Sequence, residues 1–223
     1  MAFHDDPGVR EEAPKASGPR FFFRIIAQEA AALLKLNLLF LLFCLPAVTI
    51  PPALLALFQV VRRMPAERTV RCWSQFWDAF RHRWRTAWGA FLLTVLPLTA
   101  AGYGAWFYLH FARDNPVSYL PFAFCAVVFL TALLASSYLW GLLSEGRELT
   151  KETLLLSLRL GLGRPLRAAL AAAGWYLPLA AAVLWLPLSG AYLLLIGFSI
   201  PCLLALFLIR TVLERFGGSP ADQ

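Results

Sequence analysis

Few side chains in this sequence could do chemistry, and their spacing builds no catalytic or metal-binding set. Among the three His residues, His82 follows Asp78 by four positions, which on a helix is typical of an exposed polar pair. Ser136 and Ser137 lie inside a long apolar run, where hydroxyls usually bond to the backbone of their own helix. These patterns predict no metal ion, no cofactor and no enzyme activity.

The four cysteines give the same indication. Cys44, Cys125 and Cys202 stand in apolar runs, Cys72 stands apart from them, and no two form a C-x-x-C pair. Such residues behave as small buried hydrophobic groups and not as a zinc site or a disulfide framework.

Two amide side chains, Asn37 and Gln59, are polar exceptions within the apolar run 36–61. They lie at similar distances from a proline-rich centre. If the run folds into a hairpin, the two amides can hydrogen-bond to each other across its arms. The alternative is that each amide lies near the lipid headgroups and is solvated by water.

The composition indicates which kind of protein positions these groups. The chain has 223 residues, of which 60% are hydrophobic and 15% are charged, whereas a soluble domain is about 45–50% apolar and about 25% charged. These values exclude a soluble globular domain, a disordered chain and a disulfide-rich scaffold, and they indicate an integral membrane protein. The net charge of +7 fits basic residues that flank membrane segments and not nucleic-acid binding.

Four apolar runs have the length of membrane-spanning helices, which is about 20 residues. None of them contains Asp, Glu, Lys or Arg before the terminal Arg210. The four predicted spans are residues 88–109, 119–143, 168–187 and 190–210.

The apolar run 36–61 differs because its middle carries Pro46, Pro51 and Pro52. Proline removes a backbone N–H donor and holds the preceding residue in extended geometry. We therefore predict a helix that ends just before these prolines, a turn, and a second helix that returns. The returning arm, residues 53–64, would be about 18 Å long against a bilayer core of about 30 Å, so the hairpin is either re-entrant or spans a thinned region.

The distribution of basic residues decides between a single crossing and a hairpin. With a single crossing of residues 36–61, six of the 20 Lys and Arg residues would lie on one side and fourteen on the other. With a hairpin, all of them except Arg113 lie on the same side. Because cytoplasmic loops are enriched in Lys and Arg, the hairpin is favoured and both termini are predicted to be cytoplasmic.

An amphipathic segment precedes the second hairpin, and a weaker one precedes the third. In the first segment, aromatic side chains share one helical face and basic side chains the other, which is typical of helices at the membrane surface. The basic groups also favour contact with anionic lipid. The predicted interface residues are Trp73, Trp77, Arg81, Trp84, Arg85, Trp88, Arg164 and Arg167.

These patterns predict an all-α, polytopic membrane helical bundle of about six helices, with additional interfacial amphipathic helices. We expect a disordered tail over residues 1–19, a single membrane domain over residues 20–212 and a short C-terminal tail over residues 213–223. The three hairpins are predicted at about residues 20–64, 74–143 and 148–210.

Three stretches of the sequence resemble the YesL-like family of bacterial membrane proteins, and the resemblance extends over roughly residues 20–212. The stretches are LNLLFLLFCLPAVTIPPALLALFQVVRRM, FWDAFRHRWRTAWGAFLL and SEGRELTKETLLLSLRLGLGRPLRAAL. In the first, Pro51 and Pro52 follow the Thr-Ile pair where the family usually has a glycine. Such proteins carry a domain of unknown function, so the resemblance assigns no catalytic residue.

The resemblance implies a multi-pass protein of the bacterial inner membrane. It further implies an accessory or regulatory role in carbohydrate uptake and utilisation, with ABC-type sugar transporter subunits as partners. The proline-broken hairpin favours a different function, a small transporter or channel in its own right, because broken helices often build substrate sites.

Overall fold

The computed structural model describes residues 19–64, 72–111, 116–185, 190–195 and 197–216. Within these ranges the protein is all-α, which confirms the predicted fold class. The short 3₁₀ turns η1 (Ala47–Thr49) and η2 (Pro116–Ser118) join some of the helices. The helices are α1 (Pro19–Cys44), α2 (Ile50–Arg63), α3 (Cys72–His82), α4 (Trp84–Phe111), α5 (Tyr119–Ser144), α6 (Lys151–Gly163), α7 (Pro165–Leu184), α8 (Gly190–Leu195) and α9 (Ser199–Phe216).

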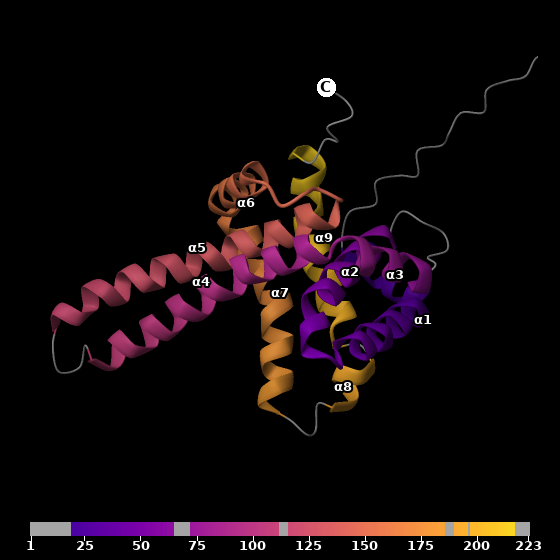
Figure 1. Cartoon of the computed structure of the whole chain (residues 1–223), viewed down its shortest axis with the longest axis horizontal. Coiled ribbons are helices and arrows are strands. Elements are labelled where there is room, and N and C mark those ends of the chain that lie inside the picture. Colours follow the sequence, from indigo (N-terminus) through magenta and orange to yellow (C-terminus); the bar gives the residue numbers. More distant parts are fainter. Residues whose placement is uncertain (1–18, 65–71, 112–115, 186–189, 196, 217–223) are drawn as a thin grey trace, which may run out of the picture.

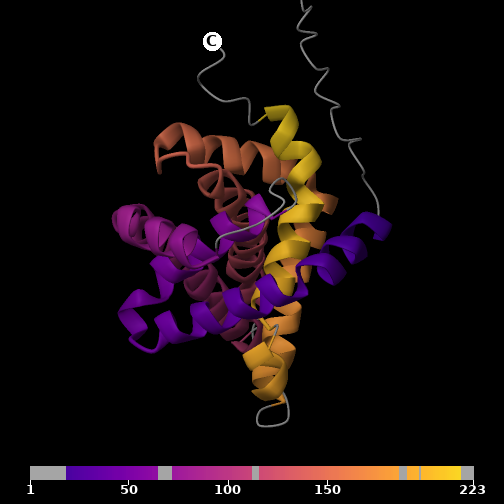
Figure 2. The same cartoon turned by 90° about the vertical axis from the view of Figure 1, so that its right-hand side faces the viewer.

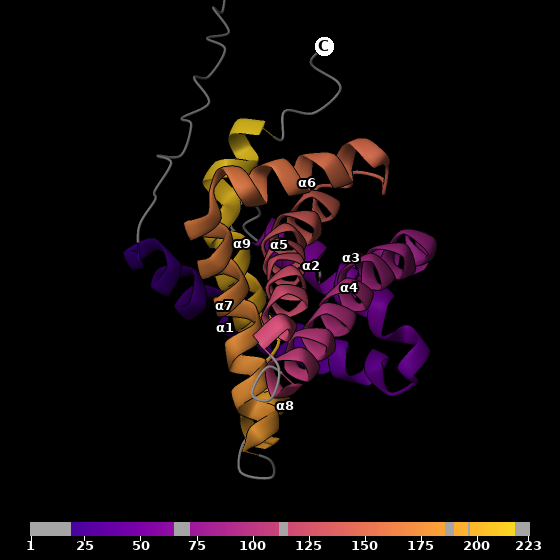
Figure 3. The ribbon, with the colours of Figure 1, turned by 90° about the vertical axis from the view of Figure 1, so that its left-hand side faces the viewer.

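Three hairpins organise these helices. Helix α1 packs against α2, α4 against α5, and α7 against α9, while α3 lies beside α2 and α6 beside α5. Helices α4 and α5 run side by side and project from the other helices as an arm (Figure 1). Figure 2 shows α1 crossing α9, and Figure 3 shows α6 lying across the end of α5.

Three helical stretches are long and apolar enough to cross a bilayer, namely Ile26–Cys44, Trp84–Phe111 and Pro116–Ser144. The chain is therefore a helical membrane bundle. Helix α1 has a kink at Glu29, whose backbone is non-helical (φ −107°, ψ 15°). The kink separates the first ten residues of α1 from most of its membrane-spanning part.

The proline-rich turn between α1 and α2 forms where the sequence predicts it. Pro51 and Pro52 lie in the first turn of α2, where backbone N–H groups have no partner within the helix and proline is tolerated. The hydroxyl of Thr49 donates to the carbonyl oxygen of Pro46 at 2.5 Å and also contacts that of Phe43. The backbone N–H of Thr49 also donates to the carbonyl oxygen of Pro46, at 2.9 Å, so Thr49 connects the turn to the end of α1.

Helix α2 forms the centre of the bundle. Ten of its 14 residues are buried, and it packs against α1, α3, α4, α5 and α9. At 1.5 Å per residue it is about 21 Å long, shorter than the bilayer core. Protein surrounds the helix itself, but the irregular turn that precedes it is not buried, since residues 45–48 are exposed.

The predicted continuous span over residues 190–210 is wrong, because the segment is broken between α8 and α9. At Gly197 the chain turns so tightly that a Cβ atom would lie 2.6 Å from the Cα of Leu193. Pro201 lies in the first turn of α9, where its missing N–H is not required. Gly197 and Pro201 together start a new helix where a hydropathy pattern indicates one continuous helix.

The two predicted tails lie mostly outside the described residues. Helix α1 begins at Pro19, and residues 1–18 are not described. Helix α9 continues to Phe216, and residues 217–223 are not described.

Candidate functional site: a buried polar junction at a broken helix

Asn37 of α1 is fully buried (0% exposed) and contacts the break between α8 and α9. Its Nδ2 donates to the carbonyl oxygen of Leu193 at 2.8 Å. Its Oδ1 accepts from the backbone N–H groups of Phe198 (3.0 Å) and Ser199 (3.3 Å). These partners define which end of the amide is oxygen and which is nitrogen. Asn37 therefore bridges α1 to both halves of the broken helix.

The Asn37 side chain replaces hydrogen bonds that a continuous helix would make within itself. In such a helix the carbonyl of Leu193 would accept from the N–H of Gly197. The first N–H groups of α9 likewise lack partners within the helix, and the Asn37 carbonyl oxygen serves as their cap. A buried backbone group left unpaired costs about 1–3 kcal/mol. The break is therefore stable only while Asn37 occupies it.

Besides the Tyr138 hydroxyl of α5, two further polar atoms in the bundle interior are buried without a hydrogen-bond partner among the described residues. They are the Nε2 of Gln59, a residue that is 7% exposed, and the Oγ of Ser199, a residue that is fully buried. Ser199 also supplies one of the N–H groups that Asn37 caps. Because buried polar groups normally have a partner, the Ser199 hydroxyl leaves hydrogen-bonding capacity at the junction for a water or a ligand hydroxyl.

The structure gives Asn37 and Gln59 different roles from those that the sequence suggests. Within the described part of the chain, Asn37 bonds the α8–α9 break and does not hydrogen-bond to Gln59. Both side chains are buried, so solvation at the headgroups does not apply either. The sequence singles out Asn37 as a polar exception in an apolar run, but its partners in the structure lie more than 150 positions away.

A second polar cluster caps the end of α5 with arginine side chains from other parts of the chain. Arg62, in the last turn of α2, forms an ion pair with Glu145 at 2.6 Å and donates to the carbonyl oxygen of Gly141 at 3.3 Å. The Nε of Arg147 lies 3.4 Å from the other carboxylate oxygen of Glu145. Positive groups are favourable here, because the exposed carbonyls at the end of a helix carry partial negative charge.

Arg83, between α3 and α4, completes this cap. Its guanidinium donates to the carbonyl oxygen of Leu143 at 2.7 Å and also to that of Arg147. Burial lowers the pKa of Arg83, and the nearby negative charge of Glu148 opposes this shift. An arginine stays protonated in proteins, so the cap remains positive. It joins the end of α2 and the start of α4 to the end of α5.

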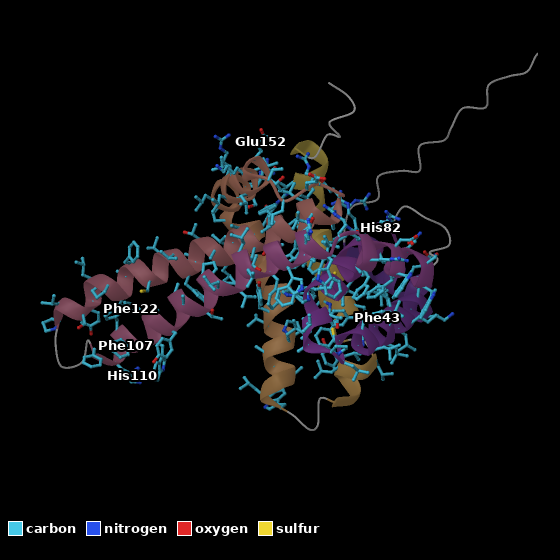
Figure 4. The ribbon with its side chains drawn as sticks, in the orientation of Figure 1. Phe43, His82, Phe107, His110, Phe122 and Glu152 are labelled. Carbon is cyan, nitrogen blue, oxygen red and sulfur yellow. The ribbon has the colours of Figure 1, made fainter. Side chains whose placement is uncertain are left out.

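The predicted aromatic face before the second hairpin divides into two groups. Phe76 and Phe80 are buried and pack on Phe43 of α1, with ring centroids 5.4 and 4.8 Å apart. Trp73 and Trp77 also contact Phe43 but remain 63% and 41% exposed. Figure 4 labels Phe43 within this cluster. The phenylalanines thus attach α3 to α1, and the tryptophans face outward.

The remaining predicted interface residues lie around the ends of α3, α4 and α6. Trp88 and Arg164 are partly buried. The exposed members are Arg81, Trp84, Arg85 and Arg167.

Groups suited to acid–base or metal chemistry do not cluster in the described residues, where no three His, Cys, Asp or Glu side chains could hold a metal ion. The Nδ1 of His82 lies 2.9 Å from the carbonyl oxygen of Asp78, and that of His110 lies 3.0 Å from the carbonyl oxygen of Trp106. Both rings are exposed and lie in different parts of the molecule (Figure 4). Burial raises the pKa of the Cys72 thiol, which lowers its reactivity.

Sequence reasoning did not find the cap at the end of α5. The sequence pattern uses Arg62 and Arg83 only as basic charges that mark the sides of the membrane, and it assigns no role to Glu145. The available signal was their position, because Arg62 and Glu145 come directly after apolar runs. A basic side chain that follows a membrane helix so closely is well placed to donate to carbonyl groups at the end of a helix, and an acidic side chain at the same level can pair with it.

Residues 33–103 match the family described as "Protein of unknown function, DUF624". The match covers less than half of the chain. It begins within α1 and ends within α4, so that it includes Asn37, Arg62 and Arg83. This family contains the YesL-like proteins. Neither the curated proteins nor the solved structures yielded a match to the chain. The chain is thus a helical membrane protein in which residues 33–103 are similar to the DUF624 family.

Proposed function

We propose that this protein is a multi-pass accessory protein of the bacterial inner membrane that assists or regulates carbohydrate uptake and has no catalytic activity of its own. The resemblance to the YesL-like family supports the carbohydrate role, and the DUF624 match over residues 33–103 agrees with that resemblance. ABC-type sugar transporter subunits are the proposed partners. The observation that carries the accessory role is the exposed arm formed by α4 and α5.

The arm is a pair of membrane-length helices with little burial inside this chain. Among the 18 most apolar consecutive residues of α4, 17% are buried inside the protein. The corresponding share for the stretch that contains α5 is 6%. Leu96 and Tyr103 of α4 are 66% and 68% exposed, and Leu120 and Phe124 of α5 are 79% and 71% exposed. The outer part of the arm therefore contacts the surroundings of the protein more than it contacts the rest of the chain.

Two features of the arm suit a partner's helices. Helices in a bilayer associate through van der Waals packing, and both helices of the arm carry large leucine and aromatic side chains that this chain leaves unpacked. The outer part of the arm also adds little to the core of its own chain, which lies around α2. A protein whose own stability does not need the outer part of this arm can offer that part to another protein.

The proposed topology places both termini in the cytoplasm. The positive-inside rule supports it, and so does the arginine cap, which gathers Arg62, Arg83 and Arg147 at the end of α5. A fluorescent reporter fused after Gln223 should be active, and a phosphatase that needs a periplasmic environment should be active when inserted next to Arg113. Activity of the phosphatase at Gln223 would contradict this topology.

Co-purification tests the accessory role. Full-length protein expressed with a sugar ABC transporter should retain the permease subunits, and the double variant Leu96→Ser, Tyr103→Ser should lose most of them. The matched control is Leu166→Ser at the start of α7, a residue that is 73% exposed and lies outside the arm. Protein that isolates alone, together with a deletion strain that grows normally on every tested sugar, would exclude the proposal.

A small transporter or channel remains the second candidate, because the α8–α9 break resembles the discontinuous helices of transporters. Here Asn37 already occupies the end of the half-helix, so a transport cycle would have to displace it. Liposomes that contain the purified protein should then show flux of a sugar or an ion, and Asn37→Leu should abolish it. The absence of flux for all tested solutes would exclude this candidate.

A further inference from the structure

A groove of about 330 Å³ lies between α4, α5 and α6. This volume is at the lower end of the range of ligand pockets, about 300–1,000 Å³. Small side chains leave the space open, among them Ala132 and Ala135 of α5 and Ser157 of α6. Gly161 lets α6 approach α5 closely, because a Cβ atom there would lie 3.1 Å from the backbone of Leu134. Figure 3 shows α6 crossing above the arm at this point.

The side chains that line the groove favour an apolar ligand. Thr94 and Thr131 donate to the carbonyl oxygens of Ala90 and Val127, at 2.9 and 2.8 Å. Ser136 and Ser157 both donate at 2.7 Å, to carbonyl oxygens three positions earlier in their own helices. The four hydroxyls are therefore satisfied by their own helices, and the rest of the lining is mainly aliphatic. An apolar cavity of this kind excludes water and gains dispersion energy when hydrocarbon fills it.

The groove lies where hydrocarbon chains of the bilayer can reach it. Two of its three walls belong to the stretches that are long enough to cross a bilayer, Trp84–Phe111 and Pro116–Ser144. At its rim, Val127 and Leu158 are 64% and 36% exposed, so the groove opens toward the surroundings of the arm. In a bilayer those surroundings are acyl chains.

The helix that closes the groove also carries a positive charge in register with it. Leu154 and Leu158 line the groove from α6, and Lys151 precedes them on the same helical face at spacings of three and seven residues. Lys151 is exposed and takes part in none of the ion pairs found among the described residues. An occupant with an apolar chain and a negative headgroup matches both features.

We propose that this groove binds one acyl chain of an anionic phospholipid, with the lipid phosphate beside Lys151. The acyl chain replaces the missing packing atoms between α4, α5 and α6. The phosphate interacts with an ammonium group that has no carboxylate partner within this region of the chain. The lipid therefore acts as a structural ligand that joins α6 to the arm.

Photocrosslinking tests this site. Full-length protein is placed in vesicles of phosphatidylethanolamine and phosphatidylglycerol, the latter with a diazirine on one acyl chain. Adducts should concentrate on peptides that contain the groove residues of α5 and α6. Ala132→Phe should fill the groove and lower these adducts at least five-fold, and Ser157→Leu should act in the same direction. Leu120→Phe, at the exposed start of α5, is the control and should leave them unchanged.

The headgroup is tested with matched vesicles in which phosphatidylcholine carries the diazirine. Wild-type protein should prefer the anionic lipid, and Lys151→Gln should reduce that preference by about five-fold, the factor that corresponds to about 1 kcal/mol per lysine near an anionic surface. Adducts spread evenly along the arm would overturn the site. Equal labelling by both lipids would overturn the anionic assignment, and persistent labelling in both groove-filling variants would show that the acyl chain lies elsewhere.

Discussion

The bundle around α2 and the outer part of the α4–α5 arm contrast in how they use polar groups. The bundle contains Asn37, Arg62 and Arg83, whose side chains each bond the backbone of another segment. In the arm, Thr99 and Thr131 bond only to carbonyl oxygens of their own helices. The centre of the bundle also buries large apolar side chains such as Leu55 and Leu57, whereas the outer part of the arm exposes Leu96, Leu120 and Phe124.

This difference indicates which interactions determine how the helices pack. In a bilayer the surroundings of a helix are as apolar as its neighbours, so burial of leucine selects a partner helix only weakly. A polar side chain inside the bundle has few acceptable partners, because an unpaired group is costly there. The bundle is thus defined by a few long-range hydrogen bonds. The arm keeps its internal structure and offers its outer faces to lipid or to another protein.

The largest expected effect follows from removal of the Asn37 amide. Asn37→Leu introduces an apolar side chain of similar size and leaves the backbone groups of Leu193, Phe198 and Ser199 without their side-chain partner. With two to three buried hydrogen bonds lost, the free energy of unfolding should fall by about 3–6 kcal/mol. Denaturation in mixed micelles, followed by tryptophan fluorescence, measures the change.

Leu38→Ala is the control for this substitution, because Leu38 is the next residue and is 48% exposed. It should change the free energy of unfolding much less than Asn37→Leu does. If both variants lose the same stability, the polar junction does not define the bundle.

A pair of leucine truncations within α5 compares the two regions directly. Leu142 is fully buried in the bundle, and Leu120 is 79% exposed on the arm. Leu142→Ala should cost about 2–5 kcal/mol, since it removes packing and leaves a cavity. Leu120→Ala should change the unfolding free energy by less than about 0.5 kcal/mol. Chemical denaturation of the two variants in detergent measures these changes. If both variants lost several kcal/mol of unfolding free energy, the surface of the arm around Leu120 would be packed against another molecule and not exposed.

Two glycines near helix ends differ in how closely other atoms approach them, so their substitution by alanine tests the backbone geometry. Gly197→Ala should destabilise the protein by about 2–3 kcal/mol, because its new Cβ would overlap the backbone of Leu193. Gly163→Ala should be neutral or stabilising by up to about 1 kcal/mol, since no atom lies within 4 Å of its Cβ position. Thermal melting in detergent distinguishes the two, and a harmless Gly197→Ala would argue against the α8–α9 break.

The smallest effect is expected at the cap of α5. Arg62 is 30% exposed at its side chain and Glu145 is 10% exposed, so solvent weakens their attraction. Arg62→Met should cost about 1–2 kcal/mol through the ion pair and the bond to Gly141. A double-mutant cycle with Glu145→Gln, measured by denaturation, isolates the pair; additive effects would show that the two side chains do not interact.

Sequence reasoning reached the secondary structure and the hairpin order from local patterns. Hydropathy indicated the helices of the arm, and the prolines around residues 46–52 predicted the turn between α1 and α2. The same reasoning failed at residues 190–210, where hydropathy outweighed the signal from Gly197 and Pro201. It also treated the aromatic residues before α4 as one face, although burial separates Phe76 and Phe80 from Trp73 and Trp77.

The sequence predicts only part of the candidate site. A polar residue in an apolar run is recognisable, and Asn37 was recognised. Its partners could not be found in the same way, because the Phe198 N–H that it caps lies 161 positions away and belongs to a backbone that carries no side-chain signal. The same holds for Arg83, whose acceptors are carbonyl groups of α5 and of the segment after it.

The sequence by itself determined that this chain is a helical membrane protein, where its main helices run and where its first hairpin turns. These properties follow from composition, from proline geometry and from hydropathy, all of which act over a few residues. Only the tertiary structure decided that α2 is the buried centre, that Asn37 holds a broken helix and that the arm projects from the bundle. The reason is physical: a buried polar group must be satisfied, but which distant atom satisfies it depends on how the helices pack.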